Sequence, residues 1–353
     1  MNTLKKIIFE FILCIAFLFC SVYNQSVYAK KVEIEQAKLV AVNFYLEQSV
    51  TTLSSKSVSI TGNYKISNNS LILYYIFNFS NNGFVIVAAD DALTPILGYS
   101  YESVYTEQNQ PSQFISWMDS YKKQISKAIT SNYIATPEIK AAWERLNVKL
   151  KDFKAVKEIQ ATTPLLLSKW SQDECYNDLC PADAAGPGGK CYVGCVATAM
   201  GQVMYYYRYP NQGQGSHSYY SNYGNLSVNF GTSTYDWNAM TNSCDISNSA
   251  IAKLLYHCGV SVDMNYAPDA SGAYMDDAKD ALKNHFKYSS NIQIADKDSY
   301  TSTAWENLLK NELDNKRPVL YSGDDVNDGG HAFVCDGYQG TNYFHFDWGW
   351  AGN

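Results

Sequence analysis

The first half of the chain is poor in reactive side chains. No cysteine lies between residues 30 and 170, and all five histidines come after residue 210. The same stretch contains no glycine-rich loop of the kind that cradles phosphate. A region without thiols, imidazoles or a phosphate loop has little to offer catalysis, so we expect residues 30–150 to form a non-catalytic module and the chemistry to lie further along.

Charge is also scarce. Charged residues make up 17% of the 353 residues, the net charge is −7, and no basic patch is present. This composition excludes a disordered or coiled-coil protein and argues against nucleic-acid binding. The length is sufficient for two domains with ordinary hydrophobic cores.

The first 29 residues have the layout of a secretory signal peptide. Lys5 and Lys6 precede an apolar run over residues 7–22, which Glu10 interrupts. Val27 and Ala29 then provide small residues at positions −3 and −1 of a cut after Ala29. A membrane anchor is the alternative, but the run is shorter than the ~20 apolar residues that span a bilayer. We therefore expect a secreted, cell-surface or periplasmic protein with no stable membrane insertion after cleavage.

Seven cysteines remain once the two in the signal peptide are removed, and an odd number leaves at least one thiol unpaired within the chain. They are Cys175, Cys180, Cys191, Cys195, Cys244, Cys258 and Cys335. Spacing leaves the disulfides open, with Cys175–Cys180 or Cys180–Cys191 as candidate pairs. A four-thiolate zinc site at Cys175, Cys180, Cys191 and Cys195 is the metal alternative. It lacks the usual two-residue spacing, so we expect no metal and no cofactor.

Hydrophobic periodicity predicts an α+β module in residues 30–150, followed by a separate domain. The predicted elements of the module are a helix within 31–55, strands at 71–77, 83–89 and 95–100, and helices at 111–130 and 137–150. Residues 151–163 are polar and read as a protease-sensitive linker. The module is either an accessory domain or a folding and inhibitory pro-segment, and composition favours neither.

The second domain, residues 164–353, combines helices with strands. A small-residue apolar helix follows Cys195 and ends near Pro210, and residues 211–235 contain a hairpin. Further helices are predicted at 251–258, 274–286 and 303–315, and strands at 318–321, 331–337 and 343–348, with a loop over 322–330.

Four side chains of this domain form a candidate catalytic set. Cys195 begins a helix, where the dipole can lower a thiol pKa toward ~4–7 and so make a nucleophilic thiolate. His331 follows Gly330 at the start of a strand and is the candidate base. Asp347 ends the next strand and is expected to orient the imidazole. Gln172 and the Cys195 backbone N–H are expected to stabilise an oxyanion. The ordinary alternative is a small buried cysteine and an unrelated histidine.

These motifs resemble the streptopain family of bacterial cysteine peptidases, and within it the interpain-type enzymes. The shared residues are Leu165-Leu166, Trp170, Gln172, Tyr176-Asn177, Cys180-Pro181, residues 194–200, Tyr235-Asp236-Trp237, residues 330–338 and Trp348-Gly349-Trp350. Residues 83–90 and 97–100 are similar to that family's pro-domain. The likeness runs in order through residues 164–353.

The resemblance implies a papain-like fold with a helical lobe and an antiparallel β lobe, preceded by an α+β pro-domain. It also implies a secreted zymogen and endopeptidase activity with a preference for hydrophobic side chains at the second subsite. The pro-domain would act as an intramolecular inhibitor that displaces His331 from Cys195 until an autocatalytic cut between about 150 and 163. Gly330, Trp348 and Trp350 would support the cleft that binds protein or peptide substrates.

Two departures from the family pattern affect these expectations. The family usually has Asn before Trp-Gly-Trp, where this chain has Asp347, and a carboxylate can also orient an imidazole. Relatives continue through a further strand, so the sequence ending at Asn353 predicts a truncated β lobe. The alternative functions are a Cys-His-Asp amidase or acyltransferase, and a non-catalytic binding or inhibitory protein.

Overall fold

The structure is a computed structural model that describes residues 30–49, 58–108, 110, 112–149, 161–325, 329–340 and 342–351. The predicted signal peptide and residues 151–160 of the predicted linker lie outside these ranges. None of the helices within them is both long enough and apolar enough to cross a bilayer. The chain divides into two compact units, and the division falls inside helix α3 (Ser112–Thr130). One unit comprises Met1–Asn109 with Met118–Ala155, and the other Gln110–Trp117 with Val156–Asn353.

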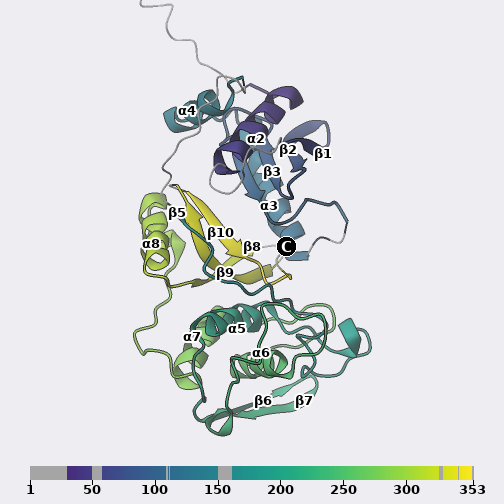
Figure 1. The fold of residues 1–353 in the computed structure, drawn as a ribbon, viewed down its shortest axis with the longest axis vertical. Coiled ribbons are helices and arrows are strands. Elements are labelled where there is room, and N and C mark those ends of the chain that lie inside the picture. The colour runs from purple at the N-terminus through teal and green to yellow at the C-terminus, as the bar shows by residue number, and fades with distance from the viewer. Residues whose placement is uncertain are drawn as a thin grey trace, which may run out of the picture. The chain divides into compact units, whose positions relative to one another are not determined.

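The first unit is an antiparallel four-stranded sheet with helices, as predicted (Figure 1). Its elements are α2 (Ile34–Ser49), β1 (Ile60–Asn68), β2 (Leu71–Phe79), β3 (Phe84–Ala88), β4 (Ile96–Ser100), α3 (Ser112–Thr130) and α4 (Pro137–Leu146). Helix α2 packs against β2 and β3 through a buried face that includes Val40 and Phe44. The sheet order is β1-β2-β3-β4, so each strand pairs with its neighbour in sequence.

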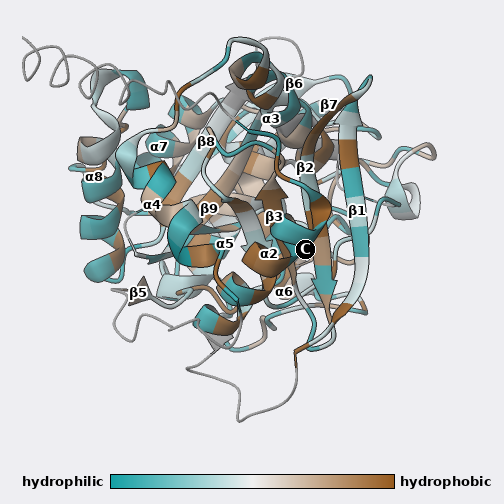
Figure 2. Cartoon of the chain, turned by 90° about the horizontal axis from the view of Figure 1, so that it is seen from above, coloured by the Kyte–Doolittle hydropathy of each residue, from teal (hydrophilic) through white to brown (hydrophobic). Residues whose placement is uncertain are grey.

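Strand β1 was not predicted from the sequence. It lies at the edge of the sheet, and none of its residues is fully buried. In Figure 2 it is mostly hydrophilic, whereas its partner β2 carries a hydrophobic run that is buried from Leu73 onward. An edge strand that pairs on one side and faces solvent has no need of an apolar pattern, so its sequence gives little signal.

The second unit contains a helical lobe built around α5, which begins at Cys195 as predicted (Figure 1). The elements of this lobe are α5 (Cys195–Tyr207), β6 (Ser216–Ser221), β7 (Gly224–Asn229), α6 (Ser249–Ser261) and α7 (Met275–Asn284). Residues Val196 to Tyr205 of α5 are all buried. One core surrounds α5 and α6 and includes Met200, Leu254 and Leu255. The helix that carries the candidate nucleophile is therefore the centre of this lobe.

Gly194 fixes the point at which α5 begins. Its φ is +92°, a conformation that L side chains rarely adopt. A Cβ at this position would lie 2.5 Å from the Met264 sulfur and 3.2 Å from the Ser271 carbonyl oxygen. Only glycine allows the chain to turn into the helix here, which leaves the first backbone N–H groups beside Cys195 uncapped by any side chain.

The β lobe of the second unit is an antiparallel sheet beside α8. Its elements are β5 (Ala161–Thr162), α8 (Ser302–Asp314), β8 (Val319–Asp325), β9 (Gly329–Gln339) and β10 (Tyr343–Asp347). Strand β9 pairs with β8, β10 and β5. It also packs against α5 of the helical lobe, so the two lobes meet along the segment that follows His331.

Two predictions about this sheet are corrected. The loop predicted over 322–330 is partly strand, because β8 continues to Asp325, which pairs with Gly329. The predicted linker 151–163 also extends too far, since Ala161 and Thr162 pair with Gln339 and Tyr338 of β9. The Thr162 hydroxyl donates a hydrogen bond to Asp314 of α8. These polar residues belong to the sheet, although their sequence resembles that of a linker.

Candidate active site

Cys195 is the first residue of α5 and is half-buried at the junction with β9. Burial raises the pKa of its thiol above the ordinary value, and the backbone N–H groups of Ala332, Val196 and Cys195 only partly oppose that rise. The low pKa predicted from the helix dipole is therefore not found in this structure. Among the described residues only backbone N–H groups act against this desolvation, and they do not outweigh it.

His331 lies on β9 beside Ala332, whose N–H faces the thiol. Its Nε2 is 3.0 Å from the carbonyl oxygen of Trp348. A carbonyl only accepts, so Nε2 carries the proton and Nδ1 is the unprotonated nitrogen. Nδ1 is buried and has no hydrogen-bond partner among the described residues. Burial lowers the pKa of this imidazole to about 4, so the ring is neutral at pH 7.

The Trp348 indole stacks on the His331 ring, with 6.2 Å between centroids and 13° between planes. The same residue therefore holds the imidazole by its ring and by its carbonyl oxygen. Gly330 pairs with Asp324 of β8, immediately before His331. Trp348 and Gly330 were both predicted to support the cleft, and both lie next to the His331 imidazole.

Asp347 was predicted to accept a hydrogen bond from the imidazole, but its partners are different. Its Oδ1 accepts from the Gln202 amide at 3.3 Å and from the Gly349 N–H at 3.0 Å. Within the described part of the chain, no hydrogen bond joins this carboxylate to His331. Burial raises the pKa of Asp347 to about 6, against the opposing effect of the two donors.

Gln172 is buried and lies beside the segment that leads into α5. Its carbonyl oxygen accepts a hydrogen bond from Val193 N–H at 2.9 Å, two residues before Cys195. Its side-chain Nε2 is buried without a partner among the described residues. An unsatisfied buried donor is costly unless a ligand completes it, which is the property expected of an oxyanion donor.

Trp350 lies near the two segments that flank Gln172 and Cys195. Its ring contacts the Tyr192 ring edge-on, with 6.2 Å between centroids. The Ala351 N–H donates to the Trp170 carbonyl at 3.1 Å, which places Trp350 next to the segment containing Gln172. Its indole Nε1 is also buried and unpartnered in the described structure. The predicted cleft residue is thus a second donor beside the candidate oxyanion site.

The disulfide of this unit joins Cys175 to Cys244, two cysteines 69 residues apart. Neither candidate pair from the sequence is formed, and Cys175 is unavailable for a four-thiolate zinc site. Cys180, Cys191, Cys195, Cys258 and Cys335 are free thiols.

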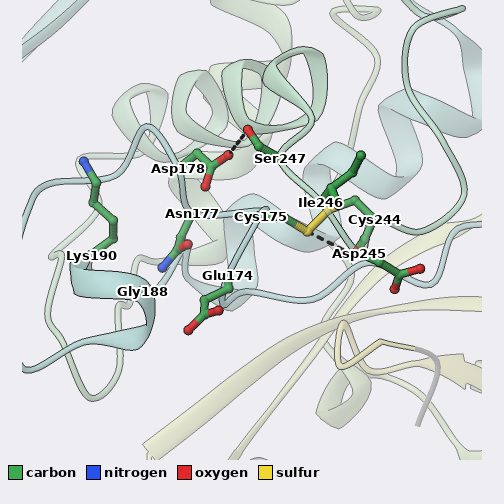
Figure 3. Close-up of a pocket in the computed structure, with 10 residues that line it drawn as sticks. All are labelled: Glu174, Cys175, Asn177, Asp178, Gly188, Lys190, Cys244, Asp245, Ile246 and Ser247. Carbon is green, nitrogen blue, oxygen red and sulfur yellow. Dashed lines mark hydrogen bonds between the residues drawn. A yellow bond between two sulfur atoms is a disulfide. The ribbon is translucent and has the colours of Figure 1, made fainter.

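The disulfide lines a pocket of about 320 Å³ (Figure 3). Glu174, Asp178 and Lys190 are among its other lining residues, and the Ser247 hydroxyl is hydrogen-bonded to Asp178. Cys195 and His331 do not line this pocket. It lies on the segment that follows Gln172, apart from the thiol and the imidazole.

A thiol at a helix N-terminus, an imidazole with a free lone pair on the adjoining strand and a buried amide donor are the parts of a nucleophilic acyl-transfer site. Together with a helical lobe and an antiparallel β lobe, they define a papain-like cysteine hydrolase.

Comparison with known proteins assigns the family. Residues 170–353 match the Peptidase C10 family, and residues 29–125 match the Spi protease inhibitor family. The chain belongs to the Peptidase C10 family and is a cysteine-type peptidase with an inhibitor-like pro-domain region, as the streptopain-like motifs predicted.

Two curated relatives illustrate the likeness. Streptopain of Streptococcus pyogenes is 32% identical over 300 residues, which cover 79% of this chain and 71% of streptopain. The thiol protease/hemagglutinin PrtT of Porphyromonas gingivalis is 29% identical over 330 residues. That match covers 90% of this chain but 37% of PrtT, so the chain spans little more than a third of that relative.

Two solved structures are similar to the chain. A prointerpain A fragment of Prevotella intermedia matches with a TM-score of 0.67 and 30% identity, covering 82% of this chain and 89% of the fragment. Active interpain A cysteine protease from the same organism matches with a TM-score of 0.50 and 34% identity, covering 55% of this chain and 83% of that one. These matches confirm the predicted papain-like fold with a preceding α+β pro-domain.

Sequence reasoning missed two participants in the site. The imidazole partner is the Trp348 carbonyl, and every residue has such a group, so no side-chain pattern reports it. Gln202, the partner of Asp347, did give a signal: it is a fully buried glutamine within an apolar helix. A polar side chain at such a position must find a partner.

Because the Cys195 thiol and the His331 imidazole are both neutral in this structure, we can predict how the full-length chain reacts with iodoacetamide. Only the thiolate reacts, and the pKa of Cys195 is above its ordinary value. Alkylation should therefore be slow at pH 6 and rise by about tenfold per pH unit through pH 8. His331→Ala should follow the same profile, and subtracting Cys195→Ala removes the contribution of the other thiols. A rate that is constant from pH 5 to 8 in the unprocessed chain would instead indicate a preformed thiolate–imidazolium pair.

Proposed function

We propose that the protein is a secreted cysteine endopeptidase made as a zymogen, which hydrolyses peptide bonds of proteins through Cys195 and His331. The observation that carries the proposal is the tautomer of His331. The Trp348 carbonyl holds the Nε2 proton, and Nδ1 is left free, buried and beside the segment that contacts the thiol. This is the arrangement that a base for Cys195 requires.

The proposed reaction begins with transfer of the Cys195 proton to His331 Nδ1. The thiolate then attacks the peptide carbonyl carbon, and the carbonyl electrons move onto oxygen. Gln172 Nε2–H and the Cys195 N–H donate to that oxyanion. Collapse expels the amine, which takes the proton from Nδ1 and leaves a thioester on Cys195. Water then attacks the thioester with His331 as base, and the carboxylic acid and thiol are released.

Formation of the ion pair has to overcome the burial that keeps both groups neutral in this structure. A thiolate and an imidazolium in contact stabilise each other most strongly where water is excluded. Each would then reverse the pKa shift of the other, raising that of His331 and lowering that of Cys195. We propose that the active enzyme differs from this structure in having that contact.

The pro-domain is proposed to keep the pair apart until it is removed. The inhibitor-family match over residues 29–125 supports this role. We propose residues 30–150 as the pro-domain and residues 164–353 as the peptidase domain. Since Ala161 and Thr162 are strand residues of the peptidase unit, we place the autocatalytic cut before Ala161, within the earlier range of about 150 to 163.

Cys195→Ala should abolish hydrolysis of a casein substrate and shortening of the full-length chain, because the thioester can no longer form. His331→Ala should lower kcat/KM by about four orders of magnitude, since the thiol loses its base. Fluorogenic peptides and mass spectrometry measure the two activities. Mixing the intact Cys195→Ala chain with wild type then shows whether cleavage occurs between molecules.

The same experiment separates the alternatives. A wild-type chain that releases ammonia from amides but cleaves no peptide is an amidase. A chain that is inert, unlabelled by a thiol-directed epoxide and never shortened is a binding or inhibitory protein.

Gln172→Ala should lower kcat by about 100- to 1000-fold while changing KM little, because the lost donor acts on charge that develops only in the transition state. Gln214→Ala is the matched control. The Gln214 amide donates to the Lys283 carbonyl on an exposed surface, so its loss should leave kcat unchanged. If the two variants have the same kcat, Gln172 does not donate to the oxyanion.

Export is the remaining part of the proposal. The N-terminal sequence predicts removal of residues 1–29. Mass spectrometry of the exported Cys195→Ala chain, which does not process itself further, should find Lys30 at the N-terminus. Retention of residues 1–29 in a membrane fraction would favour an anchor.

A further inference from the structure

A buried hydrogen-bond chain connects the nucleophile helix to the turn that holds His331. The Ser168 hydroxyl donates to Gln202 Oε1 at 2.9 Å, and Gln202 Nε2 donates to Asp347 Oδ1 at 3.3 Å. The Gly349 N–H donates to the same Asp347 oxygen at 3.0 Å. Ser168, Gln202 and Asp347 are each at least nine-tenths buried.

Gln202 and Cys195 lie on the same face of α5. Seven residues separate them, and seven residues make almost two full turns, or about 10 Å along the axis. The face that presents the thiol therefore also presents the Gln202 amide, two turns further on. Both polar atoms of the Gln202 amide are used: Oε1 accepts from Ser168 and Nε2 donates to Asp347.

At its other end, this series of hydrogen bonds fixes the turn after β10. Asp347 is the last residue of β10, and Trp348 follows it directly. The Gly349 N–H donates to Asp347 Oδ1, so the residues before and after Trp348 are hydrogen-bonded to each other. Gly349 has φ +72°, and a Cβ there would lie 3.1 Å from Thr198 Cγ2, so the turn lies directly on α5. The Trp348 carbonyl that binds His331 Nε2 is part of this turn.

We propose that Gln202 is a positioning residue for catalysis. Through Asp347 it fixes the Trp348 carbonyl, and so the imidazole of His331, relative to the helix that carries Cys195. Ser168 in turn fixes the orientation of the Gln202 amide. This inference rests on the proposed function, since it assigns a role within the same catalytic pair.

The link needs Asp347 as an acceptor and does not need its charge. Both donors bind Oδ1, so a proton on Oδ2 leaves the two hydrogen bonds intact. The charged groups that act on Asp347 are Asp336 of β9, which raises its pKa, and His345 of β10, which lowers it. Asparagine at this position keeps the accepting oxygen and loses the titration.

The test compares four variants of the full-length chain after processing by a trace of wild-type enzyme. Gln202→Leu and Asp347→Leu should each lower kcat by about 10- to 100-fold, the usual effect of a misplaced catalytic group, with KM unchanged. The double variant should have about the same kcat as either single variant, because each substitution removes the same Gln202–Asp347 hydrogen bond. Asp347→Asn should restore kcat to within about threefold of wild type, with an unchanged pH–rate profile.

A second measurement separates positioning from folding. The pH profile of Cys195 alkylation reports the thiolate–imidazolium pair. In processed Gln202→Leu the apparent thiol pKa should move up toward that of His331→Ala, while thermal unfolding remains cooperative. If Gln202→Leu does not fold, Ser168→Ala removes only the outer hydrogen bond and should shift kcat and the thiol pKa in the same direction by a smaller factor.

Three results would overturn the proposal: a folded Gln202→Leu enzyme with wild-type kcat, losses in kcat that multiply in the double variant, or an Asp347→Asn enzyme as slow as Asp347→Leu. The last would show that the charge of Asp347 matters. Failure of the proposed function is distinguishable, because wild type itself would then cleave no peptide.

Discussion

The packing of helix α5 on strand β9 is the constraint on which the rest of the site depends. Ala199 and Val203 of the helix share a core cluster with Val334 of the strand. Since Cys195 is at the start of one element and His331 near the start of the other, this packing fixes where the two segments that carry the thiol and the imidazole meet. The close approach of Gly349 to Thr198 adds the third element. Shape complementarity among apolar and small residues therefore sets the relative position of the candidate catalytic segments.

The same burial that assembles the site also suppresses its reactivity. In this structure the thiol pKa is raised and the imidazole pKa is lowered to about 4, both by desolvation. A helix N-terminus contributes at most about 1–2 kcal/mol to a charge beside it, which is too little to outweigh the burial of a thiolate. The ion pair therefore needs thiolate and imidazolium to form together, so that each charge stabilises the other. Zymogen control in such a site only has to prevent their contact.

The sequence was sufficient to predict the family and the class of enzyme but not the hydrogen bonds of the candidate site. Cys195, His331 and Gln172 stand in short motifs whose residue types follow from the reaction, and β2, β3 and α5 have strong apolar patterns. The Cys175–Cys244 disulfide could not be predicted, because the spacing of seven cysteines does not determine which of them pair. Strand β1 and residues 161–162 have polar sequences, and their pairing depends on neighbours distant in the chain. Backbone partners such as the Trp348 carbonyl leave no trace in side-chain patterns.

The contact predicted for Asp347 differs from the one that it makes. Its position at the end of β10 predicted a direct hydrogen bond to the imidazole, yet its carboxylate faces α5 and the Gly349 N–H. The distinction has an energetic consequence. A carboxylate bound to the imidazole would stabilise the imidazolium by charge, whereas one bound to Gln202 acts only by holding the turn. Burial raises the pKa of Asp347 to about 6, so ionising this carboxylate costs more here than it does in water, although it is still ionised at neutral pH. In the proposed positioning role the two hydrogen bonds to Oδ1 matter and the charge does not, so a neutral acceptor of the same shape would serve equally well.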